Sequence, residues 1–159
     1  MKRLEVKNNE NPNFIGNWDI ENNELCSQII NFFEDNADLQ IKGTTAGGVD
    51  ENVKKSTDIT IRPEKLKEKK YEIFNKYFEN LYQCFTDYKE QYDFLKTFVK
   101  KVHIGPFNIQ RYIPGGHFAR LHAERTDACC DCVSVVLAKQ NLIFIFFLCF
   151  LGGVRKTLN

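Results

Sequence analysis

The chain is poor in several residue types that mark whole classes of protein. Its 159 residues include one Met, one Trp, four Pro and three His. The net charge is +1, which gives no electrostatic reason to expect a nucleic-acid partner or an anionic membrane surface. The N-terminal residues lack the apolar segment of a secretory signal. We therefore expect a cytoplasmic protein whose six Cys are reduced thiols.

Long apolar runs are also scarce, with one exception near the C-terminal end. Ten residues, Leu142 to Leu151, follow one another without a polar interruption. A helix that spans a membrane needs about 20 apolar residues. Extending the window back to Val133 would admit Lys139, Gln140 and Asn141. A buried strand or an unfolded tail is therefore expected here, and a membrane-tethered fragment remains an alternative.

The composition of the chain changes near Thr126. Four of the six Cys lie beyond this residue, three of them in the run at 129–132, which we interpret as incidental thiols. We divide the chain into a flexible N-terminus at 1–13, a main domain at 14–126 and an atypical hydrophobic tail at 127–159.

Two segments show the periodicity of helices. Asn22 or Asn23 can cap a first helix that runs to about Asp35. The stronger signal covers residues 64–95, where large apolar residues recur at three- and four-residue steps. This aromatic stripe is expected to pack against a sheet as core and not to bind a cofactor.

Strands are expected at 14–20, 56–61, 107–112 and 117–124, with a Pro-Gly-Gly turn between the last two. Side chains alternate along a strand. One side of the third strand therefore carries Asn108, Gln110 and Tyr112, and one side of the fourth carries Phe118, Arg120, His122 and Glu124. A polar face on neighbouring strands indicates the wall of a pocket.

His122 and Glu124 are two residues apart on an expected strand, so both side chains can reach one metal ion. An imidazole and a carboxylate are two of the three ligands of the facial triad that holds non-haem iron(II). No histidine follows His122, so the usual third ligand is missing from this sequence.

The segment from Tyr112 through the turn to Glu124 resembles the tyrosine, glycine-turn and His-x-acid segment of the 2-oxoglutarate- and iron(II)-dependent dioxygenases, in their prolyl 4-hydroxylase-like branch. The order of helices and strands is similar to that branch over roughly residues 14–126. The resemblance implies an α+β fold: a partial double-stranded β-helix, or jelly roll, with packed N-terminal helices.

The resemblance also implies a set of site residues. His122 and Glu124 would be ligands of Fe(II), and Tyr112 would contact 2-oxoglutarate. The substrate is expected to be a peptide or protein side chain or a small molecule. Arg120 is a candidate substrate contact, and Asp58 and Lys55 are candidates for the site entrance.

The distal histidine and the basic residue that follows it in that branch have no counterpart after Glu124. A frameshift, a retained intervening sequence, a truncated gene model or a genuinely shortened protein would each explain the change of pattern. We expect an oxygenase domain that binds iron weakly in this chain. The alternative is a non-catalytic remnant that binds a partner through its helical face.

Overall fold

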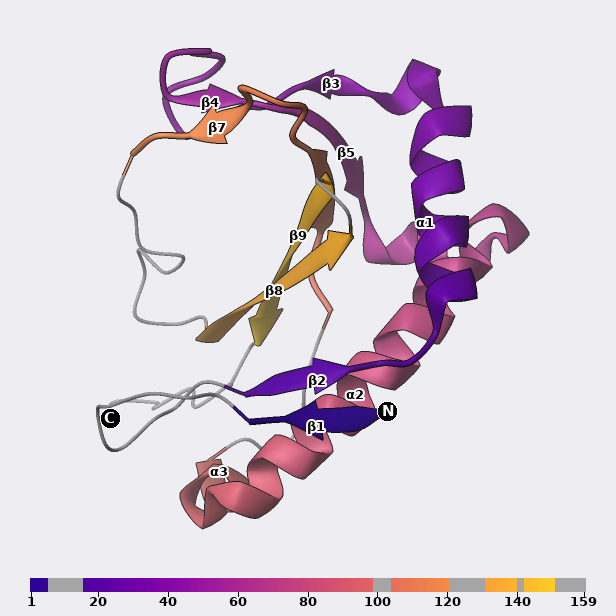
Figure 1. The fold of residues 1–159 in the computed structure, drawn as a ribbon, viewed down its shortest axis with the longest axis vertical. Helices are drawn as coiled ribbons and strands as arrows, with labels where there is room; N and C mark the ends of the chain where they lie inside the picture. Colours follow the sequence, from indigo (N-terminus) through magenta and orange to yellow (C-terminus); the bar gives the residue numbers. More distant parts are fainter. Residues whose placement is uncertain (6–15, 99–103, 121–130, 140–141, 151–159) are drawn as a thin grey trace, which may run out of the picture. The chain divides into compact units, whose positions relative to one another are not determined.

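Figure 1 shows the computed structural model, which describes residues 1–5, 16–98, 104–120, 131–139 and 142–150. The chain forms two compact units, each assembled from segments that are distant in sequence. The first unit comprises Met1–Asn31 and Leu66–Phe98, and the second comprises Phe32–Lys65 and Val99–Asn159. Helix α1, Asn23–Asp35, contributes residues to both units.

The N-terminus of the chain is partly ordered by strand pairing. Strand β1, Lys2–Leu4, pairs antiparallel with β2, Asn17–Asp19, in the register Arg3 to Trp18. Within the segment at 1–13, β2 therefore supplies residues 2–4 with hydrogen-bonding partners. Residues 6–15 lie outside the described residues.

Helix α1 begins where its cap predicts. The Leu25 backbone N–H donates to Asn22 Oδ1 at 2.9 Å, so Asn22 and not Asn23 is the cap. Glu21, just before it, has a φ of 52°, which turns the chain into the helix. The predicted helix to about Asp35 is confirmed.

The long helical segment is interrupted at both ends. Short 3-10 turns at Pro63–Lys67 and Lys69–Tyr71 precede helix α2, Glu72–Gln91, and helix α3, Asp93–Phe98, follows it. The helix predicted over 64–95 is therefore confirmed only over its central 20 residues. Its aromatic stripe is buried at Phe74, Tyr77 and Phe78, whereas Tyr82 on its flank is 63% exposed.

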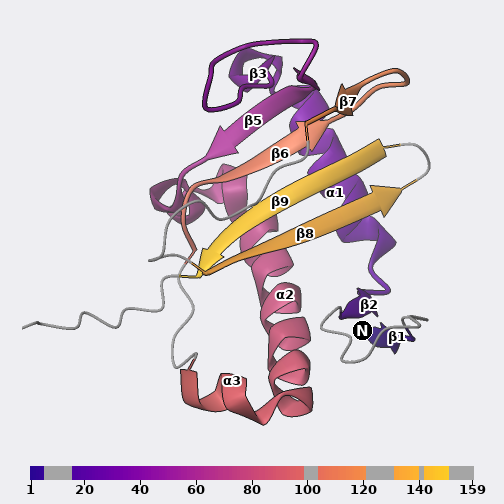
Figure 2. The ribbon, with the colours of Figure 1, turned by 90° about the vertical axis from the view of Figure 1, so that its left-hand side faces the viewer.

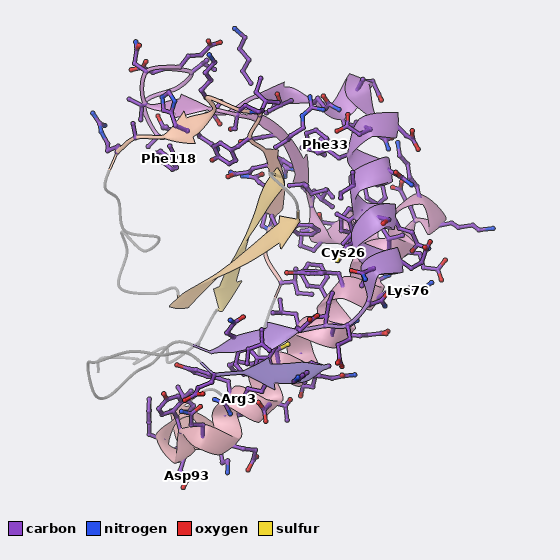
Figure 3. The ribbon with its side chains drawn as sticks, in the orientation of Figure 1. Arg3, Cys26, Phe33, Lys76, Asp93 and Phe118 are labelled. Atoms are coloured by element: carbon purple, nitrogen blue, oxygen red, sulfur yellow. The ribbon has the colours of Figure 1, made fainter. Side chains whose placement is uncertain are left out.

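A polar contact ties β2 to α2 within the first unit. Trp18 Nε1 donates to Asp87 Oδ2 at 2.7 Å, and the Trp18 ring meets Tyr88 edge-on at a centroid distance of 6.2 Å. The guanidinium of Arg3, labelled in Figure 3, lies 5.3 Å from the Trp18 ring centroid and pairs with the same aspartate. The single Trp is therefore fixed between a strand and a helix.

The second unit contains a three-stranded antiparallel sheet. Its order is β3, Ile41–Lys42, then β5, Thr57–Ile61, then β6, Phe107–Arg111. The strands predicted at 56–61 and 107–112 are thus confirmed to within a residue at each end. Figure 2 shows β5 and β6 side by side, each running the length of the sheet.

One face of this sheet is apolar. The residues that share it are opposite one another in register and at most 1% exposed: Ile59, Ile61, Phe107 and Ile109. At the end of the same face, the Arg111 guanidinium lies 5.0 Å from the ring centroid of Phe33 and pairs with Glu34 at 2.7 Å. Phe33 itself is fully buried and is labelled in Figure 3.

A second, smaller ladder stands beside the sheet. Strand β4, Lys54–Lys55, pairs antiparallel with β7, His117–Phe118. The turn before β7 contains Gly115 at φ 82°, as expected for a residue without a Cβ. The strand predicted over 117–124 is shorter than expected, since Ala119 and Arg120 are not strand and residues 121–130 lie outside the described part of the chain.

The hydrophobic tail contains a hairpin. Strand β8, Asp131–Lys139, pairs antiparallel with β9, Leu142–Phe150, and β9 runs beside β6 in Figure 2. Of the two structures expected for the apolar run, the strand is therefore confirmed. None of the helices in the described part of the chain has both the length and the apolar content to cross a membrane.

The α+β class is confirmed. The strands in the described ranges form four small sheets, and these ranges do not show a double-stranded β-helix. The jelly roll therefore remains a prediction.

Candidate functional site

The opposite face of the β5–β6 sheet is polar. The register places Asp58 opposite Gln110 and Thr60 opposite Asn108. The Thr60 hydroxyl donates to Asn108 Oδ1 at 2.7 Å at the exposed end of this face. The predicted polar side of the third strand is thus confirmed for Asn108 and Gln110, and β5 extends it with Asp58 and Thr60.

A buried ion pair forms the centre of this polar face. Lys54 Nζ donates to Asp58 Oδ2 at 2.6 Å, and the two side chains are 4% and 3% exposed. The Ser56 hydroxyl donates to the other carboxylate oxygen, Oδ1, at 2.7 Å. Asp58 therefore has a hydrogen bond at each oxygen, which offsets part of the cost of burying its charge.

The path of the chain explains how Lys54 reaches this position. Lys54, Ser56 and Asp58 alternate along an extended segment, so their side chains point to the same side. Lys54 is opposite Phe118 in the β4–β7 ladder, and its ammonium lies 5.9 Å from the Phe118 ring centroid, within cation–π range. Figure 3 labels Phe118.

Close packing of the backbone encloses the ion pair from another side. A Cβ on buried Gly43 would come within 2.2 Å of Ser56 Oγ and 3.1 Å of Lys54 Cε. The Gly43 N–H donates to the Ser56 carbonyl at 2.9 Å. Gly43 is thus needed for close approach and not for an unusual φ.

The polar network continues along β6 to Tyr112. The Gln110 amide donates from Nε2 toward Asp58 Oδ2 at 3.5 Å, and Gln110 is 2% exposed. The Tyr112 hydroxyl donates to the amide oxygen of Gln110, Oε1, at 3.1 Å. Tyr112 itself is half-buried and lies just beyond the end of β6.

His117 is held at the start of β7. Its ring nitrogens lie 3.3 Å from the Gly115 carbonyl oxygen (Nδ1) and 3.4 Å from the Asn52 carbonyl oxygen (Nε2). A neutral imidazole has one N–H and can donate to only one of these acceptors at a time. The His117 side chain is half-buried, and the residue pairs with Lys55 in the β4–β7 ladder.

The other predicted site residues have varied outcomes. The proposed iron ligands His122 and Glu124 lie outside the described residues. Arg120 is exposed after β7, and Lys55 is exposed beside the buried Lys54. Of the two residues suggested for the site entrance, Asp58 is instead the buried centre of the polar network.

The side chains that the structure describes form no ready metal centre. No three His, Cys, Asp or Glu side chains within them are grouped so that they could hold a metal ion. In the first unit, burial raises the pKa of the Cys84 thiol, and its Sγ lies 3.1 Å from Met1 Sδ. A raised pKa keeps this thiol protonated at neutral pH, so it is a poor nucleophile.

The sequence interpretation missed Lys54, although a usable signal was present. The alternation that places Ser56 and Asp58 together also places Lys54 with them, whereas Lys55 points the other way. Charge alone does not distinguish two adjacent lysines. The alternation of side chains along the strand does distinguish them, provided that the residue at which the strand starts is known.

Comparison of the chain with models of protein families, with curated proteins and with solved structures finds no match in any of the three.

Proposed function

We propose that the chain is a hydroxylase domain of the Fe(II)/2-oxoglutarate-dependent oxygenases, similar to the prolyl 4-hydroxylase-like branch. The observation that supports this best is the buried polar face of the β5–β6 sheet. This face lies beside β7, and β7 ends four residues before His122. Buried charged and polar side chains are uncommon in a core, so their grouping on one face of the sheet supports a binding wall there.

In this proposal His122 and Glu124 bind the iron. An oxygenase of this class couples the oxidation of 2-oxoglutarate by dioxygen, to succinate and carbon dioxide, to hydroxylation of a C–H bond. The metal and the keto acid supply that chemistry, and the protein supplies binding and orientation. A partial jelly roll with the helices packed on one side is the fold that we propose around this site.

The described residues fit one part of this assignment poorly. Tyr112, the proposed contact of 2-oxoglutarate, donates its only hydroxyl proton to Gln110. Lys54, the buried cation of the polar face, is neutralised by Asp58 at 2.6 Å. We therefore assign no step to Tyr112 or Lys54 in binding the keto acid.

Iron binding tests the proposal. The purified chain is titrated with Fe(II) under anaerobic conditions, in parallel with His122→Ala, Glu124→Ala and His117→Ala. We expect weak binding that His122→Ala and Glu124→Ala reduce and His117→Ala leaves unchanged, because His117 contacts backbone carbonyls in the β4–β7 ladder. Equal binding by all four proteins would reject His122 and Glu124 as ligands.

Turnover is measured separately, as succinate release from 2-oxoglutarate in the presence of Fe(II) and ascorbate. With only two proposed protein ligands, we expect no turnover by the 159-residue chain. Succinate formation that disappears in His122→Ala would show that the iron site is complete and that this expectation is wrong.

A non-catalytic binding role is the second candidate. It is favoured by two large apolar side chains that are exposed on the helices, Tyr82 at 63% and Phe94 at 50%. Reading the coding DNA downstream of codon 126 in every frame separates the two candidates. A continued strand pattern with a distal His and Arg would favour the oxygenase, and its absence would favour the binding role.

A further inference from the structure

The one methionine of the chain packs against a buried cysteine in the first unit. The Cys84 thiol on α2 donates to Met1 Sδ at 3.1 Å, and Cys84 is 8% exposed. The Met1 side chain is 19% exposed, so solvent still reaches part of it. Met1 therefore covers a buried thiol and is itself within reach of small solutes.

Strand β1, which follows Met1, is held to the first unit by few interactions. It is three residues long, all of them exposed, and forms a two-stranded sheet with β2. Arg3 pairs with Asp87 at 3.3 Å, and the Met1 amine pairs with Glu21 at 3.0 Å. Two-stranded sheets are marginal by themselves, and partly exposed ion pairs contribute little. The apolar packing of the Met1 side chain is therefore an important part of the attachment of β1.

A thioether is open to one reversible modification. A peroxide oxidises it to the sulfoxide: a sulfur–oxygen bond forms, the oxygen–oxygen bond of the peroxide breaks, and water leaves. The product is polar, whereas the thioether packs as an apolar group. Two sulfur atoms 3.1 Å apart leave no room for an oxygen between them, so the oxidised Met1 side chain must turn away from Cys84.

Cys84 does not compete with Met1 for the oxidant. Burial raises the pKa of the Cys84 thiol, which keeps it protonated at neutral pH. The thiolate is the form of cysteine that reacts with peroxides. At this pair of sulfur atoms, the partly exposed thioether is therefore the group that is oxidised first.

We propose that Met1 is a reversible oxidation site, and that conversion of its thioether to the sulfoxide releases strand β1 from β2 and uncovers Cys84. A methionine sulfoxide reductase reverses the step, since a dithiol supplies two electrons and the oxygen leaves as water. The residues involved all belong to the first unit, and the proposal does not depend on the iron site.

The single Trp is well placed to follow the release. Trp18 is opposite Arg3 in the β1–β2 register, and the Arg3 guanidinium, labelled in Figure 3, lies 5.3 Å from its ring centroid. Departure of β1 removes this cation from the ring, so the fluorescence of Trp18 should change. The chain has no other Trp to obscure the signal.

The test compares the chain with a matched form that cannot be oxidised at this position. Norleucine has a methylene in place of the sulfur, and its incorporation replaces Met1 alone, because the chain has one Met. Both proteins are treated with hydrogen peroxide, which is then removed. Peptide mass spectrometry measures the oxidation of Met1 and the rate at which iodoacetamide alkylates Cys84.

We expect oxidation of Met1 to raise the alkylation rate of Cys84 by about tenfold, as for the opening of a weakly held segment. The Trp18 emission should shift at the same time, whereas the far-ultraviolet circular dichroism should stay nearly constant, because β1 has three residues. Treatment with methionine sulfoxide reductase should reverse both changes. The norleucine form should show neither change.

Four outcomes would each overturn the proposal. The first is an unchanged alkylation rate and emission after complete oxidation of Met1, and the second is the same response in the norleucine form. The third is resistance of Met1 to a peroxide concentration that oxidises free methionine. The fourth is loss of the circular dichroism signal, since oxidation would then unfold the chain and not release β1 alone.

Discussion

Lys54 carries a positive charge into a site where its side chain is 4% exposed. Such a pair contributes little net stability, because the desolvation of two ions offsets their attraction. Breaking it is nevertheless costly, since the remaining charge stays buried without a partner. The polar network of Lys54, Ser56, Asp58, Gln110 and Tyr112 is thus a feature that stability alone does not explain.

Lys54→Met should therefore destabilise the protein by about 3–5 kcal/mol, since Asp58 loses its counter-ion. Lys54→Met combined with Asp58→Asn should recover most of this loss, because the amide oxygen still accepts from Ser56 and no charge remains. Urea denaturation measures the free energy of unfolding of the single and the double variant. Lys42→Met is the control, since the Lys42–Glu51 pair is exposed and should shift the midpoint little. A double variant as unstable as the single one would show that the charge is not the cause.

Gly43 provides a second test at the scale of one residue. Gly43→Ala places a methyl group within 2.2 Å of Ser56 Oγ, and the neighbours are themselves packed around the ion pair. We expect a loss of about 1–3 kcal/mol, as for overpacked sites. Gly47→Ala is a matched control, since the nearest atom would lie at an ordinary 3.8 Å. If Gly43→Ala and Gly47→Ala had the same melting temperature, the expected effect of overpacking would be contradicted.

At the scale of elements, helix α1 depends on its cap. Its first turn has backbone N–H groups without helical acceptors, and Asn22 Oδ1 accepts one of them. The neighbouring Asn23 is the first helical residue. The two asparagines are thus alike in sequence but differ in function.

Asn22→Ala should lower the free energy of unfolding by about 1 kcal/mol, the usual value of such a cap. Asn23→Ala should leave it nearly unchanged, because alanine is a good helix former at an exposed position. Circular dichroism during denaturation compares the two. A larger effect from Asn23→Ala would assign the cap to the other residue.

At the scale of the whole molecule, the boundary between the two units falls inside α1, between Asn31 and Phe32. Unfolding one unit alone would break helical hydrogen bonds that cross this boundary. We infer that the two units unfold together, in one cooperative transition.

Trp18 makes this measurable, since it is the single Trp and reports on the first unit through its contacts with Asp87 and Tyr88. Lys54→Met alters the second unit and should shift the midpoint of the Trp18 fluorescence transition to lower denaturant. It should shift the circular dichroism midpoint equally. A Trp18 transition that stays in place while circular dichroism becomes biphasic would show that the units unfold independently.

The sequence by itself determined the elements whose residues are neighbours along the chain. The periodicity of α1, α2, β5 and β6 is a local property, so it correctly predicted these elements and the polar side of β6. The alternation of β6 likewise predicted that Asn108, Gln110 and Tyr112 share one side.

Only the tertiary structure decided which distant residues meet. The pairing of β1 with β2 orders a segment that is polar in composition, and the pairing of β4 with β7 buries Lys54 and leaves Lys55 exposed. Gln110 links Tyr112 by hydrogen bonds to Asp58, which lies 54 positions before Tyr112 in the sequence. The physical reason is that periodicity places a side chain on a face, whereas burial and hydrogen-bond polarity depend on what the folded chain brings against that face.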